Sequence, residues 1–119
     1  MSEPLMMSCD EAINNAFDSI LPLYPNVYTG KALSYLVYNY YVIPEVFADS
    51  VAHAARYSIQ LHLYLPKKVN PNPTKLSIIN ACVVNGFTFP SMTNAGDGDG
   101  QHYVFEFEYV NGGGLYAET

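Results

Sequence analysis

Apolar residues recur at helical spacing in two stretches of the chain. The first stretch follows Ser8, which forms a capping-box pattern with Glu11, and it ends at Pro22. The second stretch opens at Pro73, which suits a first helical turn, and closes at Gly86, which suits the left-handed position after a helix. The apolar stripe predicted for the second stretch consists of Leu76, Ile79, Cys82 and Val83. The spacing therefore predicts two helices.

Other stretches have the composition or the alternation of β-strands. Residues 57–65 and 101–110 alternate between apolar and polar positions, as half-buried strands do. Residues 33–43 are dense in Tyr, Val, Leu and Ile, which favours a strand with large side chains on both faces. A shorter strand is predicted at residues 27–29, and residues 44–55 are predicted to form a loop that includes at most a helical turn.

The order of these elements, α-β-β-β-α-β, predicts an α+β fold. We expect a mostly antiparallel sheet of about four strands, with both helices packed on one face. The chain has 119 residues, which predicts one domain over residues 1–119 with loose termini at 1–7 and 112–119. A strand that is apolar on both faces, such as 33–43, is either covered on both sides or has one face in a contact between subunits.

Charge is sparse and acidic, with 11 acidic against 5 basic residues and a net charge of −6. A protein that binds nucleic acid through its phosphates usually shows a basic patch, so nucleic-acid binding of that kind is not predicted. No apolar run approaches the roughly 18 residues of a membrane span, and residues 1–12 lack the regions of a secretory signal. We therefore expect a protein of the cytoplasm, or of a particle assembled there, with no membrane partner. Eleven tyrosines and no tryptophan favour half-buried sheet faces and interfaces.

The two cysteines, Cys9 and Cys82, each fall within a predicted helix. Isolated thiols in a cytosolic chain are usually buried and reduced rather than bridged. No CxxC pair or Cys/His cluster predicts a zinc site. We expect no disulfide and no cofactor.

An acidic loop before the last strand raises a calcium hypothesis. With Gly100 at the sixth position of an EF-hand loop, Asp97 and Asp99 take the third and fifth positions and Glu106 the twelfth. Ala95 would stand at the first position without a side-chain oxygen, and a strand pattern follows where an EF-hand has a helix. The EF-hand interpretation therefore fails. A weaker calcium site on Asp97 and Asp99 stays open beside the simpler interpretation, a solvated acidic turn.

Candidate acid–base residues are few. His62 and His102 fall on the polar faces of strands that could be neighbours, and Glu106 and Glu108 share the face of His102. Such a set could form a proton or metal site, but exposed polar residues of a sheet are the simpler interpretation. No serine-hydrolase elbow, P-loop, dinucleotide fingerprint or zinc-protease motif occurs. An enzyme is not predicted.

Three segments carry a resemblance to a known family. They read "LSYLVYNYYVIPEVFADS", "RYSIQLHLYLP" and, after a helix, "NGFTFPSMTNAGDGDGQHYVFEFEYV". Together they resemble the tail terminator or tail completion proteins of long-tailed bacteriophages, over about Ser8 to Gly113. The closing stretch is the most specific part, and it is an architectural signature rather than a catalytic one.

The resemblance implies a structural role in a virion. Members of the family are α+β proteins that form a ring, usually of six copies. The ring caps the tail tube, stops its polymerisation and offers a docking surface for the head connector. For this chain that implies a hexameric ring in the tail or neck, assembled in the host cytoplasm, with the tail tube protein and the connector protein as partners. The acidic balance suits a lumen through which DNA passes without specific binding.

Candidate contact residues follow from charge and from the tyrosine-rich strand. Arg56 is the best single candidate, because an arginine in an acidic protein often pairs with a carboxylate across an interface, although a solvated charge at a strand start is an equal alternative. The full set is Arg56, Lys67, Lys68, Asp97, Asp99, Tyr38 and Tyr40. The alternatives to a tail terminator are another head–tail connector or tail assembly protein, and a small ligand-binding or enzymatic domain that uses His62, His102 and Glu106.

Overall fold

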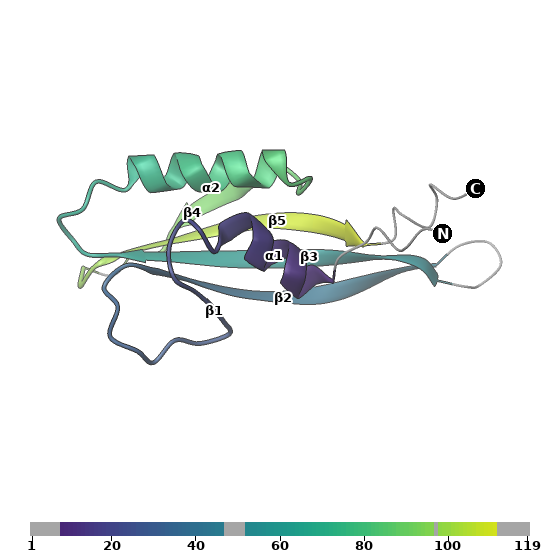
Figure 1. Ribbon diagram of the computed structural model, residues 1–119, viewed down its shortest axis with the longest axis horizontal. Coiled ribbons are helices and arrows are strands. Elements are labelled where there is room, and N and C mark those ends of the chain that lie inside the picture. Colours follow the sequence, from purple (N-terminus) through teal and green to yellow (C-terminus); the bar gives the residue numbers. More distant parts are fainter. Residues whose placement is uncertain (1–7, 47–51, 97, 112–119) are drawn as a thin grey trace.

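The computed structural model describes residues 8–46, 52–96 and 98–111, and the predicted loose termini lie outside this range. Two helices and five strands follow one another along the chain (Figure 1). They are α1 (Cys9–Phe17), β1 (Leu23–Pro25), β2 (Tyr35–Val46), β3 (Ala52–Leu65), α2 (Asn72–Val84), β4 (Ser91–Asn94) and β5 (Gln101–Asn111). The predicted α+β class is confirmed.

The strands form one sheet in the order β1-β2-β3-β5-β4. β2, β3, β5 and β4 pair antiparallel, while β1 pairs parallel with the start of β2, which makes the sheet mixed. The fifth strand, β4, was not predicted, because all four of its residues are exposed and no alternation marks it. The short strand predicted at 27–29 is wrong, because the chain pairs with β2 earlier, at Leu23–Pro25.

The loop predicted at 44–55 is also wrong wherever the structure describes it. β2 continues to Val46, and β3 begins at Ala52, so the two strands form one long antiparallel pair. The ladder includes a register shift between Glu45 and Val46, which is the signature of a β-bulge. Local composition does not favour a strand here, but continued pairing with a long partner strand outweighs local propensity.

Both helices pack on one face of the sheet, as predicted. Their buried side chains join those of the strands in one hydrophobic cluster. Its largest fully buried members are Phe17, Phe105, Ile13, Leu36, Ile59, Leu61, Leu63, Ile78 and Cys82. α1 begins with the predicted capping box, in which Ser8 Oγ accepts from the Glu11 N–H and Glu11 Oε1 accepts from the Ser8 N–H, each at 3.1 Å.

The orientation of α2 differs from the prediction. Ile78 and Cys82 are fully buried against the sheet, whereas Leu76 is 65% exposed and Val83 is 56% exposed. The helix carries apolar residues around most of its circumference, so their spacing does not select one face. Gly86 has φ of +82° and occupies the left-handed position after the helix, as predicted.

Both cysteines are buried in the core, as predicted, and both are free thiols. Burial raises the pKa of the Cys82 thiol to about 12. Burial, with a smaller effect of the neighbouring Asp10, raises the pKa of Cys9 to about 12 as well. These thiols are therefore protonated and poor nucleophiles at neutral pH.

Candidate functional site

The face of the sheet opposite the helices, here the open face, carries the polar positions of β3 and β5 together with a row of aromatic rings. Its residues alternate with the core residues along each strand, so that on β3 Gln60, His62 and Tyr64 interleave with Ile59, Leu61 and Leu63. Gln60, His62 and Tyr64 are half-buried, while the three residues between them are fully buried. Side chains that solvent or a partner can reach therefore gather on this face.

Six rings form a continuous stack across the open face, which we call the aromatic band. Neighbouring ring centroids in the band are 4.2, 4.5, 4.8, 4.2 and 5.1 Å apart. In spatial order the members are Tyr24, Tyr28, Tyr35, Tyr64, His102 and His62. Cross-strand aromatic pairs stabilise a sheet and fix its register. Because Tyr28 belongs to the loop after β1, the band also holds that loop against β2.

His62 and His102, for which two separate exposed histidines were the simpler interpretation, lie side by side on neighbouring strands. His62 Nδ1 and His102 Nε2 are 2.8 Å apart, so one ring donates a hydrogen bond to the other. Burial lowers the pKa of His62, the charge of a protonated His102 lowers it further, and Glu106 acts in the opposite direction. The pair therefore favours a neutral His62 at neutral pH.

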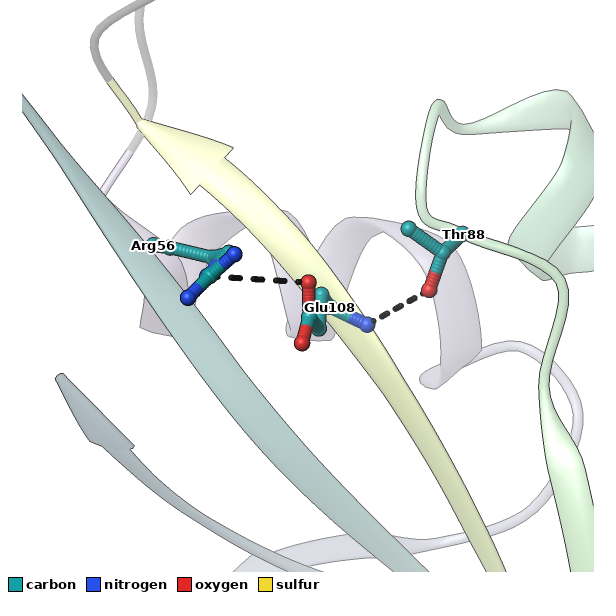
Figure 2. A network of polar contacts seen from close by, with 3 residues as sticks. All are labelled: Arg56, Thr88 and Glu108. Atoms are coloured by element: carbon teal, nitrogen blue, oxygen red, sulfur yellow. Dashed lines mark hydrogen bonds and ion pairs between the residues drawn. The ribbon is translucent and has the colours of Figure 1, made fainter. Parts of the chain in front are cut away.

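The carboxylates of β5 are each engaged by a side chain of β3. Glu106 Oε2 accepts a hydrogen bond from Gln60 Nε2 at 2.9 Å. Glu108 Oε1 lies 3.7 Å from Arg56 Nε, and both of these side chains are 40% exposed. Figure 2 shows this ion pair and Thr88, whose Oγ1 accepts a hydrogen bond from the Glu108 backbone N–H at 2.8 Å. Arg56 thus has a carboxylate partner within its own chain.

A groove of about 530 Å³ lies at one end of the sheet, where three loops meet. We call it the end groove, and it brings together two predicted contact residues, Lys67 and Asp99, with His102 of the aromatic band. The remaining lining comes from Ala32, Leu33, Tyr35, Tyr64, Leu65, Pro66, Ala95, Gly100 and Gln101. Lys68 is exposed beside it, and Asp97 lies outside the described residues.

The loops around the end groove are tied to the start of β5. Gln101 Nε2 donates to the carbonyl oxygens of Pro66 at 2.8 Å and Val69 at 2.7 Å. Gln101 Oε1 accepts a hydrogen bond from the hydroxyl of Tyr103 at 2.7 Å. These contacts hold the lysine-bearing loop after β3 in place, so the end groove is a formed feature of the folded subunit.

The two tyrosines predicted to contact a partner face α1 instead. Tyr38 is 4% exposed and belongs to the core, so the prediction that it contacts a neighbour is not supported by its position. Its hydroxyl and that of Tyr40 donate to the two oxygens of the Asp10 carboxylate, each at 2.8 Å. The hydrogen bond to Asp10, with burial, raises the pKa of Tyr40 to about 12. The sequence pattern did not reveal that this face of β2 meets a helix.

The described residues contain neither a cluster of metal-ligating side chains nor a helix that could span a membrane. Within residues 8–46, 52–96 and 98–111, no three His, Cys, Asp or Glu side chains converge to hold a metal ion. In the same part of the chain, no helix combines the length and the apolar character needed to cross a membrane. The residues after Gly100 form a strand, as predicted, where an EF-hand requires a helix.

Comparison with protein-family models and curated sequences identifies no relative of this chain. No protein-family model matches the chain, and no curated protein shows significant sequence similarity to it.

Sequence reasoning missed most of the aromatic band. Tyr35 and Tyr64 stand directly opposite one another in the β2–β3 ladder, and only this register reveals that their rings stack. Tyr28 reaches the band from a loop, for which no periodicity exists. The available signal was the number of tyrosines, which indicated a sheet face rich in aromatic contacts but not their order.

Proposed function

We propose that this protein is a structural subunit of a phage tail, one that assembles into a ring that caps the tail tube and joins it to the head connector. The observation that carries the proposal is a set of large apolar side chains that are strongly exposed in the isolated subunit. Five large apolar side chains are at least 65% exposed, namely Leu33 77%, Val84 72%, Phe89 71%, Val27 69% and Leu76 65%. Where such side chains gather on a surface, they mark sites of contact between proteins. The family resemblance of the closing stretch supports the same role.

The polar side chains of the open face are paired with one another. Glu106 accepts a hydrogen bond from Gln60, and Glu108 lies beside Arg56, so each carboxylate is engaged by a neighbouring side chain. The His62–His102 pair is linked through its own ring nitrogens. We therefore assign these groups to the stability of the sheet rather than to a reaction.

Capping requires two unlike ring surfaces. One surface complements the last ring of the tube, and the other does not repeat the surface of the tube, so polymerisation ends. The end groove, with Lys67, Lys68 and Asp99 around it, is our candidate for the contact with a stacked ring, because loops at a strand end can reach along the tail axis. A net charge of −6 suits a lumen that does not retain DNA.

A capping assay tests this proposal. The tail tube protein of the phage that encodes this chain is allowed to polymerise with and without the purified protein, and tube lengths are measured by electron microscopy. We expect shorter tubes with a ring of this protein at one end, and less capping by the variant Lys67→Glu/Lys68→Glu. Tubes of unchanged length without the protein at their ends would contradict the proposal.

A ligand-binding domain is the second candidate, and the end groove with His102 favours it. The two candidates differ in their response to His102→Ala. A tail subunit should keep ring formation, tube capping and infectivity with this substitution, whereas loss of infectivity with ring formation and capping intact would favour a ligand in the groove.

A further inference from the structure

Two long stretches of this chain contain no acidic residue. Between residues 19 and 44 the only charged residue is Lys31, and between residues 69 and 96 it is Lys75. All 11 acidic residues therefore lie outside these two stretches, although the chain as a whole has a net charge of −6. Lys75 Nζ lies 3.9 Å from the centre of the Tyr103 ring, so this charge is engaged by the protein's own aromatic surface.

The fold places the two stretches at opposite edges of the sheet. Residues 19–44 contain β1 and most of β2, and residues 69–96 contain α2 and β4. In the strand order β1-β2-β3-β5-β4, these stretches occupy the first and the last positions. In Figure 1 the loop after β1 lies below the long strands β2 and β3, and α2 lies above β3 and β5. We call them the β1 side and the β4 side.

Exposed apolar residues concentrate on the same two sides. Among the described residues, every exposed large apolar side chain except Val110 belongs to one of them. The β1 side carries Val27, Leu33, Tyr41 and Val42. The β4 side carries Val69, Leu76, Val83, Val84, Phe89 and Met92. The core of a protein interface combines these features, because it is depleted of charge and enriched in apolar and aromatic side chains.

Both sides also present strand edges that lack a partner in the described chain. β4 pairs with β5 on one edge only, and β1 pairs with β2 only over Leu36–Tyr38. The part of β2 from residue 39 onward therefore has no described strand beside it on its outer edge. Free edges of this kind are available for pairing with another chain.

We propose that the β4 side of one copy packs against the β1 side of the next copy, so that identical subunits associate head to tail. Copies of an acidic chain repel one another wherever carboxylates meet, and neither side has a carboxylate of its own to bring to such a contact. Among the carboxylates that border the two sides, Asp10 is engaged by Tyr40 and Glu106 by Gln60 within the chain. Pairing two β4 sides would leave both β1 sides exposed to water. Head-to-tail contact covers both sides, and it produces a ring when the rotation closes.

This inference rests on the proposed ring and names the surfaces that build it. The partner is a second copy of this chain, and the tail tube is the alternative occupant that the experiment must separate. The variant Leu76→Glu places a carboxylate on the β4 side, and Val27→Glu places one on the β1 side, at positions that are 65% and 69% exposed. Val110→Glu is the matched control, because Val110 is 49% exposed and lies on neither side.

The experiment measures mass by sedimentation velocity and native mass spectrometry for each protein alone and for a mixture of the two variants. We expect the wild type and Val110→Glu to associate, and each side variant to sediment as a 13.2 kDa monomer. The mixture should form a 1:1 heterodimer, because the Leu76→Glu copy keeps its β1 side and the Val27→Glu copy keeps its β4 side. A contact between two β4 sides cannot form this heterodimer, so its appearance identifies head-to-tail packing.

Several outcomes would overturn the inference. If both side variants keep the mass of the wild type, or if the mixture forms no heterodimer, the β1 side and the β4 side are not the contact surfaces. The proposed ring survives that result if the wild type still caps tubes. A wild type that stays monomeric up to millimolar concentration overturns the second copy as occupant. If such a monomer binds tail tubes and Leu76→Glu abolishes that binding, the tube protein is the occupant of the β4 side.

Discussion

Ile78 and Leu76 lie two residues apart on α2, and the structure gives them opposite environments. Ile78 is fully buried, whereas Leu76 is 65% exposed. The substitution Ile78→Ala removes three buried carbons, each worth about 0.8 kcal/mol, and leaves a cavity, so it should lower the free energy of unfolding by roughly 2–5 kcal/mol. Leu76→Ala removes mainly solvated surface and introduces the best helix former, so the change should be under about 1 kcal/mol.

The assay is chemical denaturation followed by circular dichroism, supported by thermal melts. A loss of 3 kcal/mol corresponds to a fall in Tm of roughly 10 °C in a domain of this size. Both variants should be measured at dilutions where Tm no longer depends on concentration, so that association does not contribute. Equal losses for the two variants, or a larger loss for Leu76→Ala, would refute the orientation of α2 and with it the exposed apolar β4 side.

The remaining predictions concern single groups. Burial and the neighbouring histidine lower the pKa of His62, so the free energy of unfolding should fall as the pH drops below about 6.5, and His62→Gln should flatten that dependence in urea titrations. Tyr38→Phe removes a hydrogen bond to the Asp10 carboxylate and should cost about 1–2 kcal/mol in the same assay, while an unchanged midpoint would contradict this role. The thiols of Cys9 and Cys82 should react with a disulfide reagent only after unfolding, so reaction of the native protein would refute their burial.

Elements with one clear hydrophobic period were predictable from the sequence. β3 and β5 alternate cleanly because one face meets the helices and the other carries the polar positions. The start of α1 was predictable because Ser8 and Glu11 satisfy backbone groups locally. In each of these cases, nearby residues contain the physical cause of the structure.

Elements fixed by distant partners were not predictable in the same way. β1 exists because Leu23–Pro25 meets β2 in parallel, and β4 exists because Ser91–Asn94 meets β5. The face of α2 that packs inward is selected by the sheet, since the helix is apolar around most of its circumference. Three-dimensional pairing supplies this information, and local composition does not.

In the candidate site too, local alternation placed some residues correctly, whereas the positions of others depend on distant elements. The sequence placed His62 and His102 on the polar faces of two strands that could be neighbours, and the ring nitrogens lie 2.8 Å apart because β3 and β5 do pair. Tyr38 was expected at a partner contact, but α1 covers that face of β2 and Asp10 engages its hydroxyl. The end groove depends on three loops meeting, which no spacing along the chain encodes.

The most direct test of the central proposal is a cryo-electron microscopy reconstruction of the phage particle that carries this chain. The account predicts a ring of copies at the neck, between the last ring of the tail tube and the head connector. In that ring, the β4 side of each copy should face the β1 side of the next. Density for this chain in the capsid or the baseplate, or its absence from the particle, would contradict the account.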